Sequence, residues 1–263
     1  MLITILRYST EGLIMPNWQW FHRLGSPKWL SITLDRWLPW VLGSAFFMLA
    51  LSLIWGLAFT PPDYKQGNIF RIIYIHVPAA VVALAAYYAM AIAGAISIIW
   101  RMKVADMALR SIAPVGAVLT FIALFTGAIW GKPTWGTYWI WQDARLTSML
   151  ILFFLYLGII ALHDAFNGSA SGQRAAAIMS LVGTVNIPII YKSVDWWSSL
   201  HQPASIKFTE ESTIALEMFQ PLMLAIPGFY LFCLAAVMLH MRVQIAHHAR
   251  KNSWMIERAR IHS

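Results

Sequence analysis

The chain has 263 residues, of which 59% are hydrophobic and only 11% are charged. Soluble domains carry about 25% charged residues, so this composition excludes an ordinary soluble protein and indicates a polytopic membrane protein. The formal net charge is +8, and the single cysteine excludes an internal disulfide.

The two ends of the chain differ from its apolar middle. Residues 1–36 mix charged side chains with tryptophans, and they predict a cytoplasmic arm that lies on the lipid surface. The apolar run Met1–Leu6 is too short for the core of a signal peptide. Residues 243–263 form a basic tail that is also expected in the cytoplasm.

Six apolar segments occupy residues 37–242. A helix rises 1.5 Å per residue, so about 20 residues cross a hydrocarbon layer of roughly 30 Å, and the fourth and fifth segments are at the short limit. The sequence therefore predicts an all-α polytopic membrane protein with six transmembrane helices. The segments are 37–59, 77–100, 111–129, 146–162, 175–191 and 218–239.

The distribution of positive charge predicts the orientation of these helices. With both termini inside, 13 of the 19 Lys and Arg lie on the inner side and 6 lie in the outer loops, as the positive-inside rule requires. The outer loops are then residues 60–76, 130–145 and 192–217. The excess charge is cytoplasmic, which explains the net charge with membrane lipid as partner and without nucleic acid.

A tryptophan-rich stretch fills the second outer loop. Glycine and proline at Gly131, Pro133 and Gly136 argue against one uninterrupted helix across it. One interpretation is an interfacial aromatic belt. The other is an apolar platform for a large, flat ligand. The tryptophans are Trp130, Trp135, Trp139 and Trp141.

Two histidines are expected on the same outer side as this stretch. His76 lies where the first outer loop re-enters the membrane, and His201 lies in the third outer loop. Neutral imidazole is the usual axial ligand of haem iron, and each Trp can bury about 150–250 Å² against a flat ring. These residues predict a haem site with His76 and His201 as candidate iron ligands, while an ordinary interfacial role stays open for each histidine.

Three charged residues complete the candidate site. We expect Arg71 and Arg145 to bind the haem propionates, because guanidinium groups bind carboxylates bidentately; contact with lipid phosphate is the alternative. We expect Asp143 to pair with Arg145 and to hold the loop at the start of the fourth helix, where an acid is favoured. The sequence lacks the P-loop, HExxH and GxSxG motifs, so no catalytic residue is predicted.

Residues 130–147, which run on to Asp143-Ala-Arg145-Leu-Thr147, resemble the tryptophan-rich WWD signature of haem-handling membrane proteins. The segments Tyr74-Ile-His76-Val-Pro78 and Val194-Asp-Trp-Trp-Ser-Ser-Leu-His-Gln202 narrow the resemblance to the haem exporter protein C (CcmC) family, over about residues 37–242. The resemblance implies that haem b is bound transiently, as cargo, at the periplasmic face of the bacterial inner membrane, with His76 and His201 as iron ligands.

The resemblance also implies a set of partners. Haem passes to the periplasmic haem chaperone CcmE during cytochrome c maturation. The protein works beside the ATPase subunit CcmA, the membrane subunit CcmB and the small subunit CcmD. It is then a haem-binding and haem-presenting subunit and not an enzyme, because ATP hydrolysis belongs to CcmA.

The chain departs from the family pattern at one position. The family runs Trp-x-Trp-Asp, whereas Gln142 separates Trp141 from Asp143 here. One extra residue shifts helical phase by about 100°. The sequence therefore predicts that either the loop bulges at Gln142 or Asp143 is displaced.

Three other functions fit parts of this pattern. A haem lyase or cytochrome c synthase of the same superfamily carries more helices and further histidines within the membrane. A b-type electron-transfer cytochrome places its ligand histidines inside helices. A permease needs a polar site at the membrane midplane and broken helices. Six segments and two outer histidines favour the CcmC-like interpretation.

Overall fold

The structure is a computed structural model that describes residues 25–166, 168–197, 199–201, 214–249 and 254. These residues form helices joined by turns, with one isolated bridge between Asp63 and Gly67. Six candidate membrane spans are present, so the predicted all-α architecture with six spans is confirmed. The elements are α2 (Pro27–Ile54), the π-helical η1 (Trp55–Phe59), the 3-10 helix η2 (Asn68–Ile72), α3 (Ile73–Trp100), α4 (Lys103–Trp135), α5 (Ala144–Ala165), α6 (Ala170–Gly183), α7 (Asn186–Trp196) and α8 (Leu216–Ala249).

Several helices extend beyond the apolar segments that predict them. α2 begins at Pro27, before residue 37, because proline suits the first helical position. α4 continues past residue 129 and through Pro133 in its last turn, and it ends two residues later at Trp135. Gly136 ends α4 with a φ of 82°, and its N–H donates to the carbonyl of Lys132 at 3.0 Å. Part of the tryptophan stretch is therefore helical.

The fifth span is made of two helices, α6 and α7, rather than one. Pro188 has no N–H to donate to the carbonyl of Thr184. That carbonyl instead accepts from the N–H of Ile187 at 3.1 Å. The helix is interrupted at this point, and α7 leads into the loop that carries His201.

Helices α3 to α6 share a core, and two buried tyrosines connect these helices by packing and hydrogen bonding. The rings of Tyr87 and Tyr156 meet edge to face at 5.1 Å between centroids. The hydroxyl of Tyr156 donates to the carbonyl of Ala83 at 2.7 Å. Each tyrosine lies against a glycine of a neighbouring helix: Tyr156 against Gly116 and Tyr87 against Gly183. The missing side chains are what allow the helices to approach this closely.

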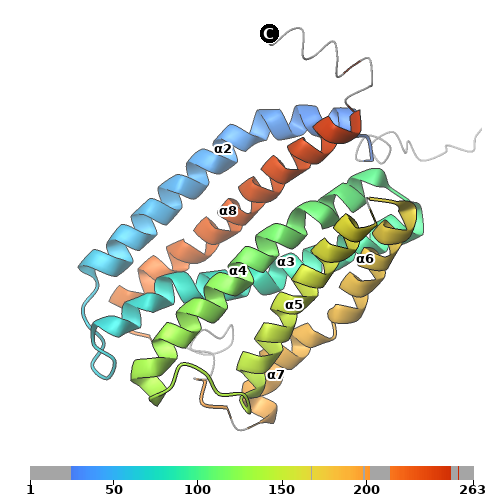
Figure 1. Cartoon of the computed structure of the whole chain (residues 1–263). Helices are drawn as coiled ribbons and strands as arrows, with labels where there is room; N and C mark the ends of the chain where they lie inside the picture. The colour runs from blue at the N-terminus through green and yellow to red at the C-terminus, as the bar shows by residue number, and fades with distance from the viewer. Residues whose placement is uncertain (1–24, 167, 198, 202–213, 250–253, 255–263) are drawn as a thin grey trace, which may run out of the picture.

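The bundle has two distinct ends (Figure 1). At one end, the start of α2 lies beside the end of α8, and Arg242 Nε contacts Asp35 Oδ1 at 2.9 Å. At the other end lie the three connections that the sequence predicts as outer loops, around residues 60–67, 136–143 and 197–201. All residues expected to form the candidate site therefore lie at or near one end of the molecule.

Gly116→Ala should lower the stability of the detergent-solubilised protein by about 1–3 kcal/mol, because the added methyl group overlaps the ring of Tyr156. The measurement is thermal unfolding. Gly43→Ala is the matched control, since a Cβ at Gly43 meets nothing within 4 Å and alanine favours a helix by about 1 kcal/mol over glycine. Equal stability of the two variants would contradict the close contact of α4 with α5.

Candidate functional site

The fold brings His76 and His201 together. His76 lies in the first turn of α3, and His201 follows α7 in the chain. Their ring centroids are 6.4 Å apart, and the ring planes are inclined by 30°. Metal–imidazole bonds are about 2 Å long, so two rings that bind one metal ion from opposite sides have centroids roughly 6 Å apart. The observed separation fits such a pair.

A hydrogen bond from α4 orients the ring of His76. Its Nδ1 lies 3.0 Å from the hydroxyl oxygen of Thr126. That hydroxyl donates its own proton to the carbonyl of Ile122 at 2.6 Å, so it accepts from Nδ1–H of His76. Nε2 of His76 then carries the lone pair that a metal ion needs. Gly127 makes room for the ring, since a Cβ there would lie 2.9 Å from Cε1 of His76.

Trp130 and Trp135, on the last two turns of α4, flank the histidine pair. Trp130 meets His76 edge to face at 5.6 Å between centroids. Its indole N–H donates to the side-chain oxygen of Gln66 at 2.7 Å, which ties α4 to the first outer loop. Trp135 lies 6.1 Å from His201 between centroids. The two indoles and two imidazoles form one aromatic cluster.

Trp139 and Trp141 form a separate pair in the connection after α4. Their rings meet edge to face at 5.6 Å between centroids. Trp141 is 68% exposed. The indole nitrogen of Trp139 is buried and has no hydrogen-bond partner among the described residues. The tryptophan stretch is therefore divided into a helical pair beside the histidines and a loop pair that leaves one indole open to contact.

Asp143 caps α5. Its Oδ1 accepts from the N–H groups of Arg145 and Leu146, each at 3.0 Å, as an N-cap side chain does. The prediction that Asp143 holds the loop at the start of the fourth span is confirmed. The predicted pairing with Arg145 is found in a different form: within the described part of the chain the carboxylate accepts from the backbone N–H of Arg145, and the guanidinium lies near enough for the two charges to interact without a direct contact. The partners of Oδ1 are N–H groups of the first helical turn, which have no acceptor within the helix.

The second oxygen of Asp143 joins two outer loops. Oδ2 accepts from the hydroxyl of Ser199 at 2.7 Å and from the N–H of Leu200 at 3.1 Å. The Ser199 hydroxyl oxygen in turn accepts from the N–H of His201 at 3.1 Å. Asp143 therefore positions the backbone that carries His201.

Gln142 lies in a turn and does not displace Asp143 from the helix. The N–H of Asp143 donates to the carbonyl of Ile140 at 3.2 Å, so Trp141 and Gln142 are the two central residues of the turn. Both are exposed, whereas Asp143 is 3% exposed. The additional residue is accommodated as a bulge of the loop, which is one of the two predicted outcomes.

The two arginines differ in their surroundings. Arg71 donates to the carbonyl of Thr60 at 2.6 Å, which holds the first outer loop, and its Nε is buried without a partner among the described residues. Arg145 is partly buried, and it lies close enough to His76 and Asp143 for their charges to interact. Arg145 is thus the cation beside the histidine pair, whereas the guanidinium of Arg71 already donates a hydrogen bond to Thr60.

Sequence reasoning assigned no role to Thr126, Gly127 or Ser199. The sequence does carry a signal for Thr126. This residue precedes Trp130 by one helical turn, so the two share a helix face once α4 is known to reach Trp135. Ser199 carries no such signal. Its role depends on where the third outer loop meets the start of α5.

The family model described as Heme exporter protein C matches residues 20–256. The chain belongs to the haem exporter protein C family. A relative with that name from Escherichia coli (strain K12) is 44% identical over 240 residues, which cover 91% of this chain and 96% of that protein. The relative from Haemophilus influenzae is 43% identical over 238 residues (90% and 96%), and the one from Paracoccus denitrificans is 43% identical over 209 residues (79% and 86%). The resemblance on which the sequence prediction rests is confirmed.

Asp143→Ala should loosen the loop that carries His201. The loss of an N-cap costs about 1 kcal/mol, and the N–H and hydroxyl groups left without an acceptor add about 1–3 kcal/mol. Hydrogen exchange of the peptide that spans residues 192–201 should be faster in this variant. Asp195→Ala is the control, because Asp195 is exposed and its ion pair is with Lys192 on the same helix. Unchanged protection in Asp143→Ala would show that the link between the loops does not form.

Proposed function

We propose that this protein binds haem at the end of the bundle that carries His76 and His201 and delivers it to a periplasmic haem chaperone during cytochrome c maturation. Two relatives named Heme exporter protein C support the proposal, since their matches cover 90% and 91% of this chain. The observation that carries the proposal is the 6.4 Å separation of the two imidazole rings beside Trp130 and Trp135. Among the described residues, these are the two histidines at this end of the bundle.

The iron ligands in this proposal are Nε2 of His76 and the imidazole of His201. The porphyrin is flat and apolar, so it packs against Trp130 and Trp135, whose rings already lie beside the imidazoles. Haem supplies the iron as cargo. The chain supplies the two imidazoles, the apolar wall and the orientation of both.

The remaining candidate residues have supporting roles. Arg145 is the stronger candidate for a propionate, and Arg71 is the second, through its unpartnered Nε. Trp139 and Trp141 extend the apolar surface outward, where the exposed ring of Trp141 can meet a partner. Asp143 acts through the loop that it holds, and not by contact with haem.

The difference between the two ligands suits transient binding. His76 is held on a helix and by Thr126. His201 lies on a loop whose described hydrogen bonds run through Ser199 and Asp143. We infer that one of the two ligands is released when the chaperone's own ligand takes its place on the iron.

The partners and location in this proposal follow the family. Haem b is accepted by CcmE, and CcmA, CcmB and CcmD form the surrounding complex, in which CcmA hydrolyses ATP. The charge count supports the bacterial inner membrane as location, with both termini cytoplasmic and the histidine pair periplasmic. The protein then acts as a binding and transfer subunit and not as an enzyme.

His76→Ala and His201→Ala should each lower the haem content of protein purified from haem-replete cells by roughly tenfold or more. Residues that only hydrogen-bond to a metal ligand already contribute about 10- to 100-fold to metal affinity, and a ligand should contribute at least as much. The measurement is the Soret absorbance per protein, together with haem transfer to the chaperone. His247→Ala, an exposed histidine near the end of α8, is the control. A Soret band that survives in both ligand variants would overturn the proposed ligands.

Thr126→Val should reduce haem binding by roughly 10-fold, since valine keeps the shape of threonine but cannot accept the hydrogen bond from His76. Thr126→Ser keeps the hydroxyl and should restore binding. Haem titration of the purified variants measures both. Equal affinity of the valine and serine variants would show that this hydrogen bond does not orient the ligand.

A further inference from the structure

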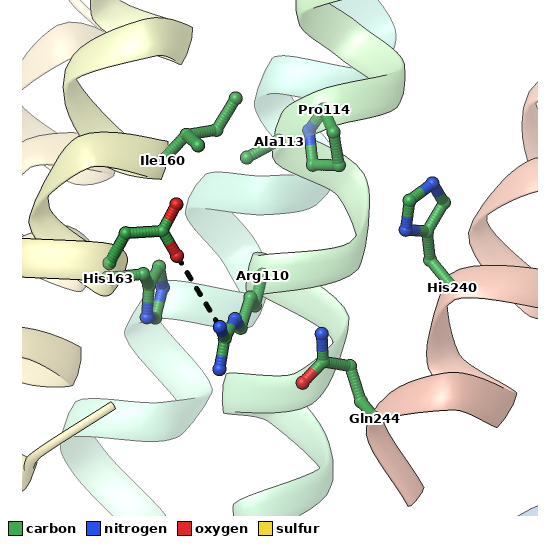
Figure 2. Close-up of a pocket in the computed structure, with 8 residues that line it drawn as sticks. Arg110, Ala113, Pro114, Ile160, His163, His240 and Gln244 are labelled. Atoms are coloured by element: carbon green, nitrogen blue, oxygen red, sulfur yellow. Dashed lines mark hydrogen bonds and ion pairs between the residues drawn. The ribbon is translucent and has the colours of Figure 1, made fainter. Parts of the chain in front are cut away.

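A pocket lies between α4, α5 and α8 (Figure 2). It is near the start of α4 and the end of α5, whereas the candidate haem site is at the opposite ends of both helices. Its volume is about 150 Å³, enough for several water molecules, each of which needs roughly 10–15 Å³. The lining residues are Arg110, Ala113, Pro114, Ile160, His163, Asp164, His240 and Gln244.

His163 is the residue of this pocket whose buried ring nitrogens are available to a ligand. Its side chain is 1% exposed. Neither Nδ1 nor Nε2 has a hydrogen-bond partner in the part of the chain that the structure describes. Buried polar atoms are nearly always paired, and an unpaired one costs about 1–3 kcal/mol. A ligand in the pocket that accepts a hydrogen bond from the ring removes this penalty.

The pocket carries one cation, Arg110, and one anion, Asp164. Arg110 contacts Asp164 at 3.5 Å, and both side chains are partly exposed, so the pair is weak. His240 and Gln244 add further hydrogen-bonding groups from α8 (Figure 2). A metal ion is disfavoured by the guanidinium, and the described residues contain no group of three His, Cys, Asp or Glu side chains placed to hold one.

We propose that this pocket binds a phosphate group, carried by an anionic phospholipid or present as soluble phosphate. Arg110 leaves Asp164 and binds two phosphate oxygens, while His163 donates a ring N–H to the same group. Basic pockets between transmembrane helices on the cytoplasmic side are typical headgroup sites. The positive-inside count predicts this end of the bundle to be the cytoplasmic one.

The test uses the full chain in nanodiscs of three kinds: phosphatidylcholine alone, phosphatidylcholine with phosphatidylglycerol, and phosphatidylcholine with soluble phosphate. Thermal unfolding gives the stabilisation, and native mass spectrometry gives the retained lipid. A rise in the unfolding midpoint with phosphatidylglycerol alone identifies a lipid headgroup. The same rise with soluble phosphate identifies the free ion. No rise in either case overturns the proposal.

Arg110→Gln should weaken binding of the stabilising phosphate source by roughly fivefold, the loss expected for one basic residue at a headgroup site. Arg242→Gln is the matched control, an exposed arginine on α8 that pairs with Asp35 at the same end of the bundle. Gln244→Leu changes another residue that lines the pocket, and it provides a second measurement of binding if Arg110→Gln fails to fold. A response that persists in both pocket variants overturns the site.

His163→Leu separates a ligand-binding histidine from one that is merely buried. Leucine removes the unpaired nitrogens, so it should stabilise the protein in phosphatidylcholine alone. If His163 binds phosphate, the same variant should respond to the phosphate source less than the wild type does. A full response in His163→Leu would contradict its role in the site.

Discussion

The carboxylate of Asp143 is the contact on which the candidate site depends. A buried carboxylate is unfavourable unless hydrogen bonds satisfy it, and this one accepts four, two from the start of α5 and two from residues 199 and 200. The two segments therefore have to come together for the acid to be buried. Their meeting places His201 next to Trp135 and opposite His76, so the second candidate ligand is positioned by a residue that need not contact haem itself.

The two halves of the site are held in different ways. His76 projects from a helix, and its ring is fixed by Thr126 of the neighbouring helix. Side chains on helices hold geometry more exactly than those on loops. His201 lies on a loop that Ser199 and Asp143 connect to the start of α5. A site that takes one ligand from a helix and the other from a loop suits a protein whose cargo is passed on.

The sequence predicted the six spans because each has enough apolar residues to cross the membrane, and it predicted the candidate ligands because His76 and His201 border the tryptophan stretch. It did not predict that α4 runs through Pro133, because proline usually ends a helix. It also did not predict the Thr126 and Ser199 contacts. These depend on the register of α3 against α4 and of one loop against α5, which no local pattern encodes.

The central claim is that one haem iron binds both His76 and His201. Resonance Raman and electron paramagnetic resonance spectra of the haem-loaded ferric protein test it most directly, because they report the coordination number and the spin state of the iron. Six-coordinate, low-spin iron with two imidazole ligands is expected, and replacing either histidine by alanine should change this coordination. Five-coordinate, high-spin iron in the wild type, or spectra that are the same in both variants, would contradict it.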